Sequence, residues 1–196
     1  MAQLASDSFN RADANPLDGS WTNGPGALVN MKLASNAVTA ATGSTDSGAF
    51  STHVLWPDDQ YSEITVGSAG TGDGGPMTRV DANGNGYMAN ANGGSITLFL
   101  ITGNGTNFGN LTSAAGSVTG TDVFRLESEG TTHRIKKNGS TVLTHTDATF
   151  GSGSAGMFNF DGSMTFDSWA GGDFTAGSVA YASPMTFQRM NTLARM

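Results

Sequence analysis

Residues 123–147, VFRLESEGTTHRIKKNGSTVLTHTD, constrain the fold most, because they predict three short antiparallel strands joined by two tight turns. Asn138-Gly139 is the stronger turn signal, since both central positions of a type I′ hairpin loop need positive φ. Gly130-Thr131 is the other two-residue loop. The two assumptions agree on a single register, so the segment predicts an antiparallel meander.

The register of this meander separates an apolar face from a polar one. It places residues opposite each other across the two turns as follows: Leu126 and Ile135, Glu127 and Arg134, Lys137 and Ser140, Ile135 and Val142, Arg134 and Leu143. One face then carries Phe124, Leu126, Ile135 and Val142, and the other carries Arg125, Glu127, Glu129, Arg134 and Lys136. A slip of one residue would exchange the two faces, so the pattern specifies the register strongly.

Composition extends this β-rich interpretation to the whole chain. Of 196 residues, 28 are glycine, 5 are proline and 13% are charged, which favours many short strands and turns over long helices. Cysteine is absent, so the fold needs no disulfide and has no thiol chemistry. The net charge of -7 argues against a general nucleic-acid binder. The N-terminal residues predict neither a secretion signal nor a transmembrane span.

The alternation of apolar and polar residues predicts about a dozen short strands. Outside the meander they are 27–31 with 36–41 as a first hairpin, 47–56, 60–67, 77–82 with 86–92 as a further hairpin, 95–102, 107–113, 155–160 and 164–169. The run 95–102, SITLFLIT, is the most apolar and is expected to be the central buried strand, and 67–76 is expected to be a glycine-rich loop. This pattern predicts an all-β antiparallel sandwich or jelly roll.

The opening stretch SFNRADANPLDGSW, the middle stretch RVDANGNGYMA, the meander and the closing stretch SAGMFNFDGSMTFDSWAGGDF resemble the corresponding parts of concanavalin-like, laminin-G-like jelly-roll domains. The resemblance covers roughly residues 7–174. That family includes lectins, accessory modules of glycosidases, glucanases and phage virion proteins. The resemblance also implies a structural calcium near the joined chain ends, where Asp7 or Asp167 could contribute, but it assigns no specific metal ligand.

The glutamates do not suggest catalysis. Glycoside hydrolysis needs two carboxyl groups across the scissile bond, and the chain has only Glu63, Glu127 and Glu129. Glu127-Ser-Glu129 departs from the Glu-x-Asp-x-Glu strand motif of the catalytic relatives. The register places Glu127 opposite Arg134, which predicts a surface ion pair of about 0–1 kcal/mol. We therefore expect no catalytic residues and a protein that is not an enzyme.

Neither metal nor proton-relay chemistry is suggested by the remaining polar motifs. The stretch DANGNG, which begins at Asp81, matches the start of an EF-hand loop, but Asn92 stands where a bidentate glutamate is needed. The flanking segments are predicted strands, so a polar hairpin turn is favoured. The predicted register places His133 and His145 on opposite faces. We expect no cofactor apart from the structural calcium that the resemblance allows.

Aromatic side chains offer either a core or a platform on which a sugar could stack. Large aromatics dominate sandwich cores, and Trp21 and Trp169 stand at positions of the resemblance that fit the core. Trp56, which precedes Pro-Asp-Asp, and Tyr87 are the better candidates for exposure. They are the predicted sugar-stacking residues.

Residues 175–196, TAGSVAYASPMTFQRMNTLARM, extend beyond the resemblance. Ser183-Pro184 is a good helix start, and so short a helix is stable only when it docks on something. This arm carries 2 of the 9 basic residues and none of the 16 acidic ones. Its expected contact residues are Tyr181, Met185, Phe187, Arg189, Met190, Leu193 and Arg195. Docking on its own domain and contact with a neighbouring subunit fit this pattern equally.

Together these features predict a jelly-roll domain, residues 1–174, followed by a C-terminal arm, residues 175–196. The predicted function is a non-enzymatic structural protein of a phage virion, a capsid decoration or tail-associated protein, whose arm binds virion proteins or identical subunits. The resemblance, not the residues, supplies the virion, and the host cytoplasm would be the place of synthesis. The alternative is a carbohydrate-binding module or receptor-binding adhesin that binds surface glycan. Neither nucleic acid nor a membrane is an expected partner.

Overall fold

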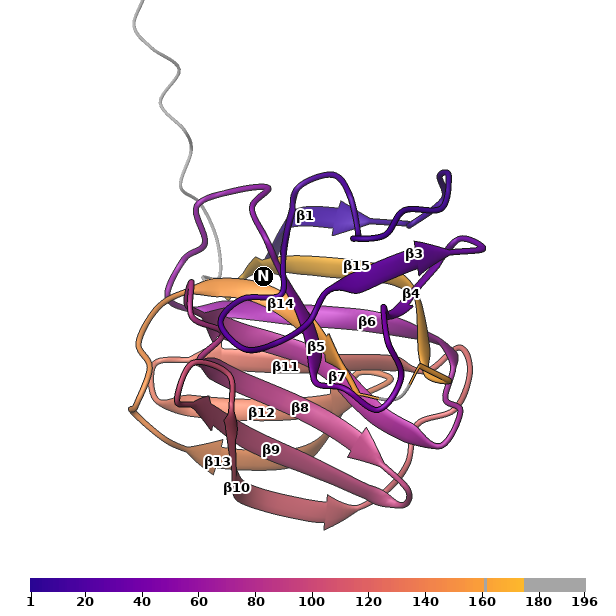
Figure 1. Cartoon of the computed structure of the whole chain (residues 1–196). Coiled ribbons are helices and arrows are strands. Elements are labelled where there is room, and N and C mark those ends of the chain that lie inside the picture. The colour runs from indigo at the N-terminus through magenta and orange to yellow at the C-terminus, as the bar shows by residue number, and fades with distance from the viewer. Residues whose placement is uncertain (161, 175–196) are drawn as a thin grey trace, which may run out of the picture.

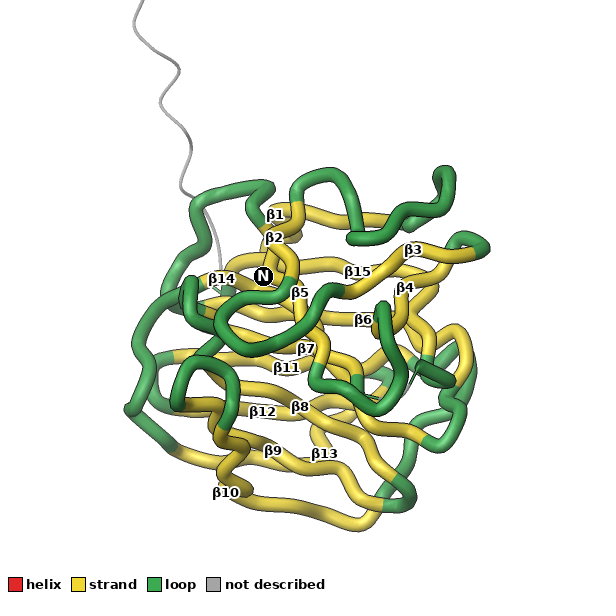
Figure 2. Tube along the Cα trace, in the orientation of Figure 1, coloured by secondary structure: helices red, strands yellow, loops and turns green. Residues whose placement is uncertain are grey.

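Two antiparallel sheets stack face to face and enclose the main hydrophobic core (Figure 1). The structure is a computed structural model that describes residues 1–160 and 162–174. In this part of the chain every regular element is a strand (Figure 2), and no helix could cross a membrane. The predicted antiparallel sandwich is confirmed. The predicted arm, 175–196, lies outside the described residues.

The eight-stranded sheet contains the meander and both ends of the described chain. Its order is β13-β12-β11-β6-β15-β4-β3, and β1 pairs with β15. The strands are Ser140–Thr146 (β13), Thr132–Lys137 (β12), Val123–Glu129 (β11), Gln60–Ser68 (β6), Thr165–Asp173 (β15), Ala37–Ala40 (β4), Met31–Ala34 (β3) and Ala2–Asp7 (β1).

The seven-stranded sheet forms the second layer, and its strands β7, β8 and β9 lie in front of β6, β11 and β12 in Figure 1. Its order is β10-β9-β8-β7-β14-β5-β2. The strands are Asn107–Ala115 (β10), Ser95–Thr102 (β9), Gly86–Asn92 (β8), Gly72–Val80 (β7), Ser154–Asn159 (β14), Ser47–Ser51 (β5) and Trp21–Asn23 (β2). Strands that are far apart in sequence are therefore neighbours, most clearly β7 and β14.

The meander has the predicted turns but contains a bulge. Asn138 and Gly139 have φ of 50° and 79°, as a type I′ loop requires, and Leu126 pairs with Ile135 as predicted. Beyond the second turn Lys137 pairs with Ser140 as predicted, but the register then shifts by one residue, because Ile135 pairs with Leu143 instead of Val142 and Arg134 with Thr144 instead of Leu143. Val142 is the extra residue of a β-bulge, and Leu143 takes its expected place in the core.

Two predictions about polar residues also need correction, the first of them because of the bulge. His133 and His145 are directly paired, so they lie on the same side of the sheet and not on opposite sides. Glu127 does face Arg134 across the strands, but it is no surface residue, because its side chain is fully buried. Its ion pairs are with Lys136 at 2.9 Å and Arg125 at 3.6 Å, whereas Arg134 pairs with Glu129.

Several predictions of strands and loops need correction: among them, the expected strand 47–56 ends at Ser51, and β2 was not predicted. The expected strand 27–31 is mostly a loop, and the first hairpin joins β3 to β4 instead. The expected loop 67–76 shrinks to 69–71, because β7 already begins at Gly72. β9 lies second from the sheet edge and is not central. β1 was not predicted, since its sequence lacks alternation and it is fixed by pairing with β15.

The core between the sheets collects the inward side chains of both layers. Trp21 and Trp169 belong to it, as predicted, with ring centroids 4.8 Å apart. Phe124, Leu126 and Ile64 from the eight-stranded sheet are fully buried there. Burial of this apolar surface is the main source of stability for such a sandwich.

Candidate functional site

A second apolar cluster lies on the outer face of the seven-stranded sheet. In β8, Tyr87 and Ala89 point into the main core, whereas Met88 between them belongs to the second cluster. β14 repeats this alternation, with Met157 inside and Phe158 outside. The buried members are Leu28, Met77, Val80, Met88, Ile101 and Phe158, with half-buried Phe50, Phe99, Phe108 and Phe160 beside them. The sheet therefore has apolar residues on both faces.

The loop 24–30 covers one end of this outer face and seats Leu28 in the second cluster. Gly26 (φ 63°) makes this close approach feasible, because a Cβ there would overlap the carbonyl oxygen of Asn83. Ala27 N–H donates a 2.8 Å hydrogen bond to Asn104 O. These contacts hold the loop over the β7–β8 and β9–β10 turns, so the opposite end of the face stays uncovered.

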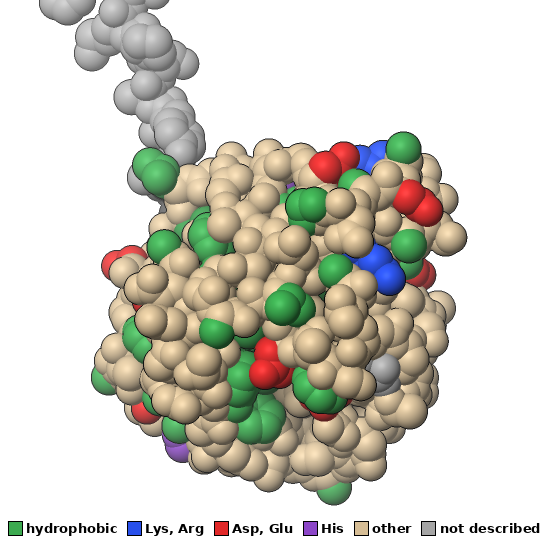
Figure 3. All heavy atoms as spheres, in the orientation of Figure 1, with side chains coloured by type: hydrophobic (Ala, Val, Ile, Leu, Met, Phe, Trp, Pro, Cys, Tyr) green, Lys and Arg blue, Asp and Glu red, His purple; other side chains and the backbone are tan. Residues whose placement is uncertain are grey.

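At the uncovered end lies a hollow of about 240 Å³ lined by Asp46, Asp73, Met88, Asn90, Asn92, Phe99, Phe108, Phe158 and Phe160. Adjacent strands supply these residues: Phe99 comes from β9, Asn90 and Asn92 from β8, Asp73 from β7, and Phe158 from β14. Asp46 immediately precedes β5. Figure 3 shows acidic and hydrophobic side chains side by side over this part of the face.

Asp73 reaches this hollow because of a β-bulge. Gly72 pairs with Asn92 and Gly74 with Ala91, so Asp73 is an extra residue in β7. Its φ of 100° is rare for a residue other than glycine. Bulges redirect side chains and occur next to active and binding sites. The flanking glycines allow the backbone distortion.

Hydrogen bonds fix the carboxylate of Asp73 but leave one buried acceptor unused. Asn90 Nδ2 donates to Asp73 Oδ1 at 2.8 Å, and Asn92 Nδ2 donates to Asp73 Oδ2 at 3.1 Å. Asn90 is only 5% exposed, and its Oδ1 has no hydrogen-bond partner among the described residues. Since a buried polar atom without a partner costs about 1–3 kcal/mol, this oxygen suits a ligand donor.

Within the described part of the chain, no cation forms an ion pair with the acids of the hollow. Burial, and then the charge of Asp73, raise the pKa of Asp46 above its usual value. None of the ion pairs among residues 1–160 and 162–174 includes Asp46 or Asp73. The lysine and arginine side chains visible in Figure 3 lie away from this group. The hollow is thus rich in acceptors, negatively charged and bordered by phenylalanine rings.

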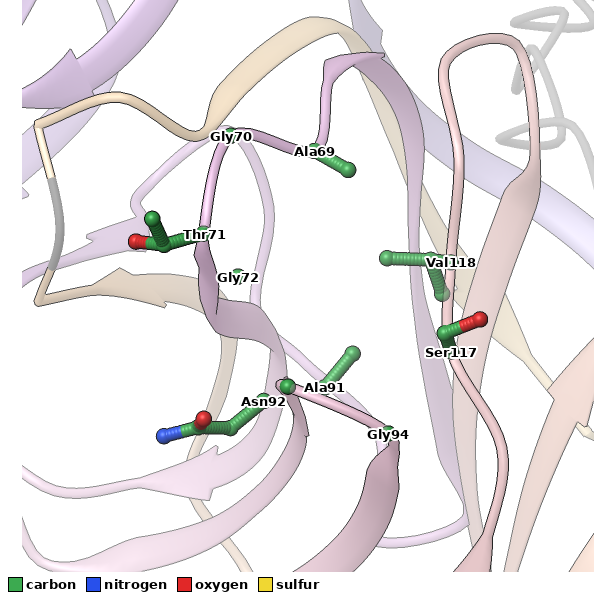
Figure 4. Close-up of a pocket in the computed structure, with 10 residues that line it drawn as sticks. Ala69, Gly70, Thr71, Gly72, Ala91, Asn92, Gly94, Ser117 and Val118 are labelled. Carbon is green, nitrogen blue, oxygen red and sulfur yellow. The ribbon is translucent and has the colours of Figure 1, made fainter.

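A second hollow, of about 260 Å³, adjoins the first and shares Asp73, Asn92 and Phe160 with it. Each is smaller than the roughly 300–1,000 Å³ usual for small-molecule sites, so a ligand of that size would extend across both. A third, of about 150 Å³, is a separate opening at the glycine-rich turns. In Figure 4, Ala91 and Val118 point into it, whereas Asn92 points away from Val118.

The two predicted sugar-stacking residues lie outside these adjoining hollows. Tyr87 is fully buried, so its predicted exposure is wrong, since inward residues of β8 face the core. Its ring packs 3.9 Å from that of His133, and its hydroxyl donates to Asp147 Oδ1. Trp56 is half-buried, and its Nε1 donates to Ser51 O at 2.8 Å while its ring packs against Trp169.

The other acidic candidates already have partners within the chain. The carboxylate of Asp81 accepts bonds from Asn83 N–H, Asn85 N–H and Asn85 Nδ2, which makes it a turn-stabilising residue. Although burial opposes this, hydrogen bonds from Arg11, Trp21 and the backbone hold the pKa of Asp7 below its usual value. The calcium site that the resemblance implies at Asp7 or Asp167 stays a prediction, as do the seven residues of the arm.

Sequence reasoning missed the site residues Asp46, Asp73, Asn90 and Asn92. A usable signal is present in GYMANAN, where Met88, Asn90 and Asn92 alternate with core residues. Alternation of this kind predicts which side chains share a face. It does not predict that β7 and β14 lie beside them, since those pairings are between distant segments.

The two stacked antiparallel sheets place the chain in the jelly-roll class of β-sandwich folds. Among solved structures, it is similar to the carbohydrate-binding module CBM66 from Bacillus subtilis, at 21% identity over 79% of this chain and 92% of that one, with a TM-score of 0.57. It is also similar to the exoplasmic/lumenal domain of VIP36 in a Ca²⁺- and mannose-bound form, at 12% identity over 82% and 85%, with a TM-score of 0.56.

The carbohydrate recognition domain of Emp47p gives a comparable match, at 12% identity over 86% of this chain and 94% of that one, with a TM-score of 0.56. No family model and no curated protein sequence matches the chain. At these identities the similarity extends to the fold, and the function has to be argued from the residues.

Proposed function

We propose that this protein is a non-catalytic carbohydrate-binding module that holds a glycan on the outer face of the seven-stranded sheet. The observation that carries the proposal is the hollow in which Asp46, Asp73 and the unpartnered Asn90 Oδ1 stand beside phenylalanine rings. The structural neighbours that are carbohydrate-binding domains support the same function.

The chemistry of the hollow matches the two kinds of surface that a sugar offers. Sugar hydroxyls donate hydrogen bonds, and those to charged carboxylates are stronger than those between neutral groups. The carbon–hydrogen faces of a sugar ring are apolar and pack against aromatic rings such as half-buried Phe99 and Phe108. Binding sites that combine apolar walls with a few fixed polar groups are typical of small-molecule recognition.

The charge of the hollow narrows the ligand class. Two carboxylates that have no ion-pair partner among the described residues repel phosphates, sulfates and uronic acids, so the ligand is a glycan without acidic groups. On the opposite face Glu127 is enclosed between Lys136 and Arg125, an arrangement that suits a structural ion pair better than a general acid. A role in a virion, with assembly through the arm, stays a prediction for residues outside the described part.

Glycan-array screening of the full chain tests the proposal, with Phe99→Ala and Asn92→Ala as site variants. We expect binding of non-acidic glycans by the unmodified chain and a loss of about tenfold or more in each variant, because each removes one side chain of the hollow. Trp56→Phe serves as the control on the surface first predicted to stack on sugars, and it should bind normally. An array without hits, or loss confined to the Trp56 variant, would contradict the proposal.

A further inference from the structure

The hollow is rich in hydrogen-bond acceptors, and two of its acceptor groups are carboxylates. Asp46 and Asp73 lie in the same hollow, and neither has an ion-pair partner among the residues that the structure describes. Elsewhere the chain balances its buried acid, since Glu127 lies 2.9 Å from Lys136. Uncompensated charge at a half-open site points to a ligand that carries the missing positive charge.

Asn90 gives independent evidence for such a ligand. Its side chain is 95% buried, given that 5% is exposed, and its amide group is held in orientation by the bond from Nδ2 to Asp73 Oδ1. This orientation leaves Oδ1 of a residue that lines the hollow as a buried acceptor without a donor among the described residues. The hollow thus presents three acceptor groups, Asp46, Asp73 and Asn90 Oδ1, and an alkylammonium group has three N–H donors.

The walls distinguish an organic cation from a bare metal ion. Four phenylalanines and a methionine line the hollow beside the acids: Met88, Phe99, Phe108, Phe158 and Phe160. Divalent cations such as calcium take six to eight oxygen ligands, from carboxylates, carbonyls and water. Aromatic rings, in contrast, attract ammonium groups through their faces and pack against the carbon atoms that carry them. A volume of about 240 Å³ also exceeds what one ion fills.

We propose that the hollow selects amino sugars, so that the glycan bound by this protein carries free ammonium groups, as glucosamine oligomers do. The ammonium group would lie among Asp46, Asp73 and Asn90 Oδ1, with the sugar ring against the phenylalanines. An N-acetylated sugar has one N–H in place of three, no charge, and a carbonyl oxygen that the carboxylates repel. The identity of the ligand as a glycan rests on the proposed function above.

A matched pair of ligands tests this selectivity in the full chain. Titration calorimetry at about pH 6, where an amine is protonated, compares a glucosamine oligomer with its fully N-acetylated counterpart of equal length. We expect the glucosamine oligomer to bind about tenfold more tightly or better, because hydrogen bonds to charged groups are the stronger ones. The preference should decrease with added salt, since these charges are partly open to solvent.

Three variants locate the selectivity. Asp73→Asn and Asp46→Asn should each remove most of the preference for the glucosamine oligomer. Asparagine tolerates the φ of 100° at position 73, so this variant keeps the fold. Asp81→Asn is the control, because it changes the net charge equally at a carboxylate that already accepts three hydrogen bonds, and it should keep the preference.

Each other outcome has a definite meaning. Equal binding of the two oligomers, or binding of other neutral glycans alone, overturns this inference and leaves the proposed function standing. Absence of any glycan binding overturns both. Calcium chloride that binds alone and loses its affinity in the Asp73→Asn variant would show that the acids serve a metal ion, and it would also overturn the amino-sugar assignment.

Discussion

The outer face of the eight-stranded sheet encloses its acids among cations, whereas the described residues provide no ion-pair partner for Asp46 and Asp73 on the outer face of the seven-stranded sheet. On the first, Glu127 is fully buried between Lys136 and Arg125, and Arg125 also pairs with Glu63 at 2.6 Å. On the second, Asp46 and Asp73 line a hollow with phenylalanines. The chain therefore supplies its own counter-charges on one face, whereas residues 1–160 and 162–174 supply no ion-pair partner for the two acids on the other.

The difference shows that buried charge alone does not identify a binding site. Glu127 is more deeply buried than either aspartate of the hollow, yet it has cationic partners in Lys136 of the neighbouring strand β12 and Arg125 of its own strand β11. A carboxylate becomes a candidate for ligand binding when the fold brings it close to an acid or an unpartnered acceptor instead of a cation.

The largest expected effect comes from breaking the buried ion pair on the outer face of the eight-stranded sheet. Lys136→Met removes the 2.9 Å partner of Glu127 and leaves a buried charge with only Arg125 at 3.6 Å. We expect the free energy of unfolding to decrease by about 3 kcal/mol. Urea denaturation measures this, and the double variant Glu127→Leu with Lys136→Met should recover most of the loss. A single variant as stable as the original chain would contradict this account of the face.

The pH dependence of stability can be used to compare the acids of the two faces only when the contribution of buried His133 is measured separately. Burial lowers the pKa of His133 to about 4. Its Nε2 lies 3.1 Å from Asp147 O and its Nδ1 lies 2.9 Å from Ser128 Oγ, so Nε2 carries the proton, because a carbonyl only accepts.

Because the unfolded chain binds this proton more readily, the stability due to neutral His133 is complete above about pH 6.5 and is lost as the pH falls toward 4. The loss is on the order of 2–3 kcal/mol. Denaturation of His133→Gln across this range should give a flatter profile than that of the original chain. Parallel profiles for the two proteins would assign the acid sensitivity to other groups.

On the outer face of the seven-stranded sheet, removing the charge of Asp46 should stabilise the ligand-free protein. The raised pKa of Asp46 means that its ionisation destabilises the folded state as the pH rises through that pKa. Asp46→Asn should therefore increase the free energy of unfolding at pH 7 by about a few tenths of a kcal/mol, given screening by solvent. Gain of stability with loss of glycan binding would be the mark of a functional acid, and a decrease in stability would argue against repulsion.

The smallest effect is expected for the exposed ion pair of the meander. Arg134 and Glu129 approach to 2.8 Å, with side chains 31% and 47% exposed. Such pairs contribute about 0–1 kcal/mol, so Arg134→Ala should change the free energy of unfolding by less than about 0.5 kcal/mol. This variant is the internal reference for Lys136→Met on the same strand, and an equal effect of both would remove the distinction between buried and exposed pairs.

Prediction from sequence succeeded where local rules decide the structure. The Asn138-Gly139 turn and the pairing of Leu126 with Ile135 follow from turn chemistry and alternation, both of which involve residues close in sequence. It failed at the bulges. Val142 and Asp73 are extra residues in their strands. Period-two alternation does not predict an extra residue that has no counterpart on the partner strand.

The prediction of Tyr87 as a surface residue failed for a related reason. Alternation divides β8 into two sets but does not tell which set faces the second sheet. Both sets are apolar in part, since Met88 belongs to the outer cluster and Tyr87 to the inner one. The closing of the two sheets decided the matter by enclosing Tyr87 with His133.

The sequence by itself determined that this chain forms an antiparallel sandwich, because turns and period-two alternation are written in adjacent residues. Only the tertiary structure decided which carboxylates pair with cations and which have no such partner among the described residues. That outcome depends on strand order, which places β7 between β8 and β14 and so brings Asp73 next to Asn90 and Phe158. Contacts between residues so distant in sequence form only when the whole core is buried, and a local pattern cannot encode them.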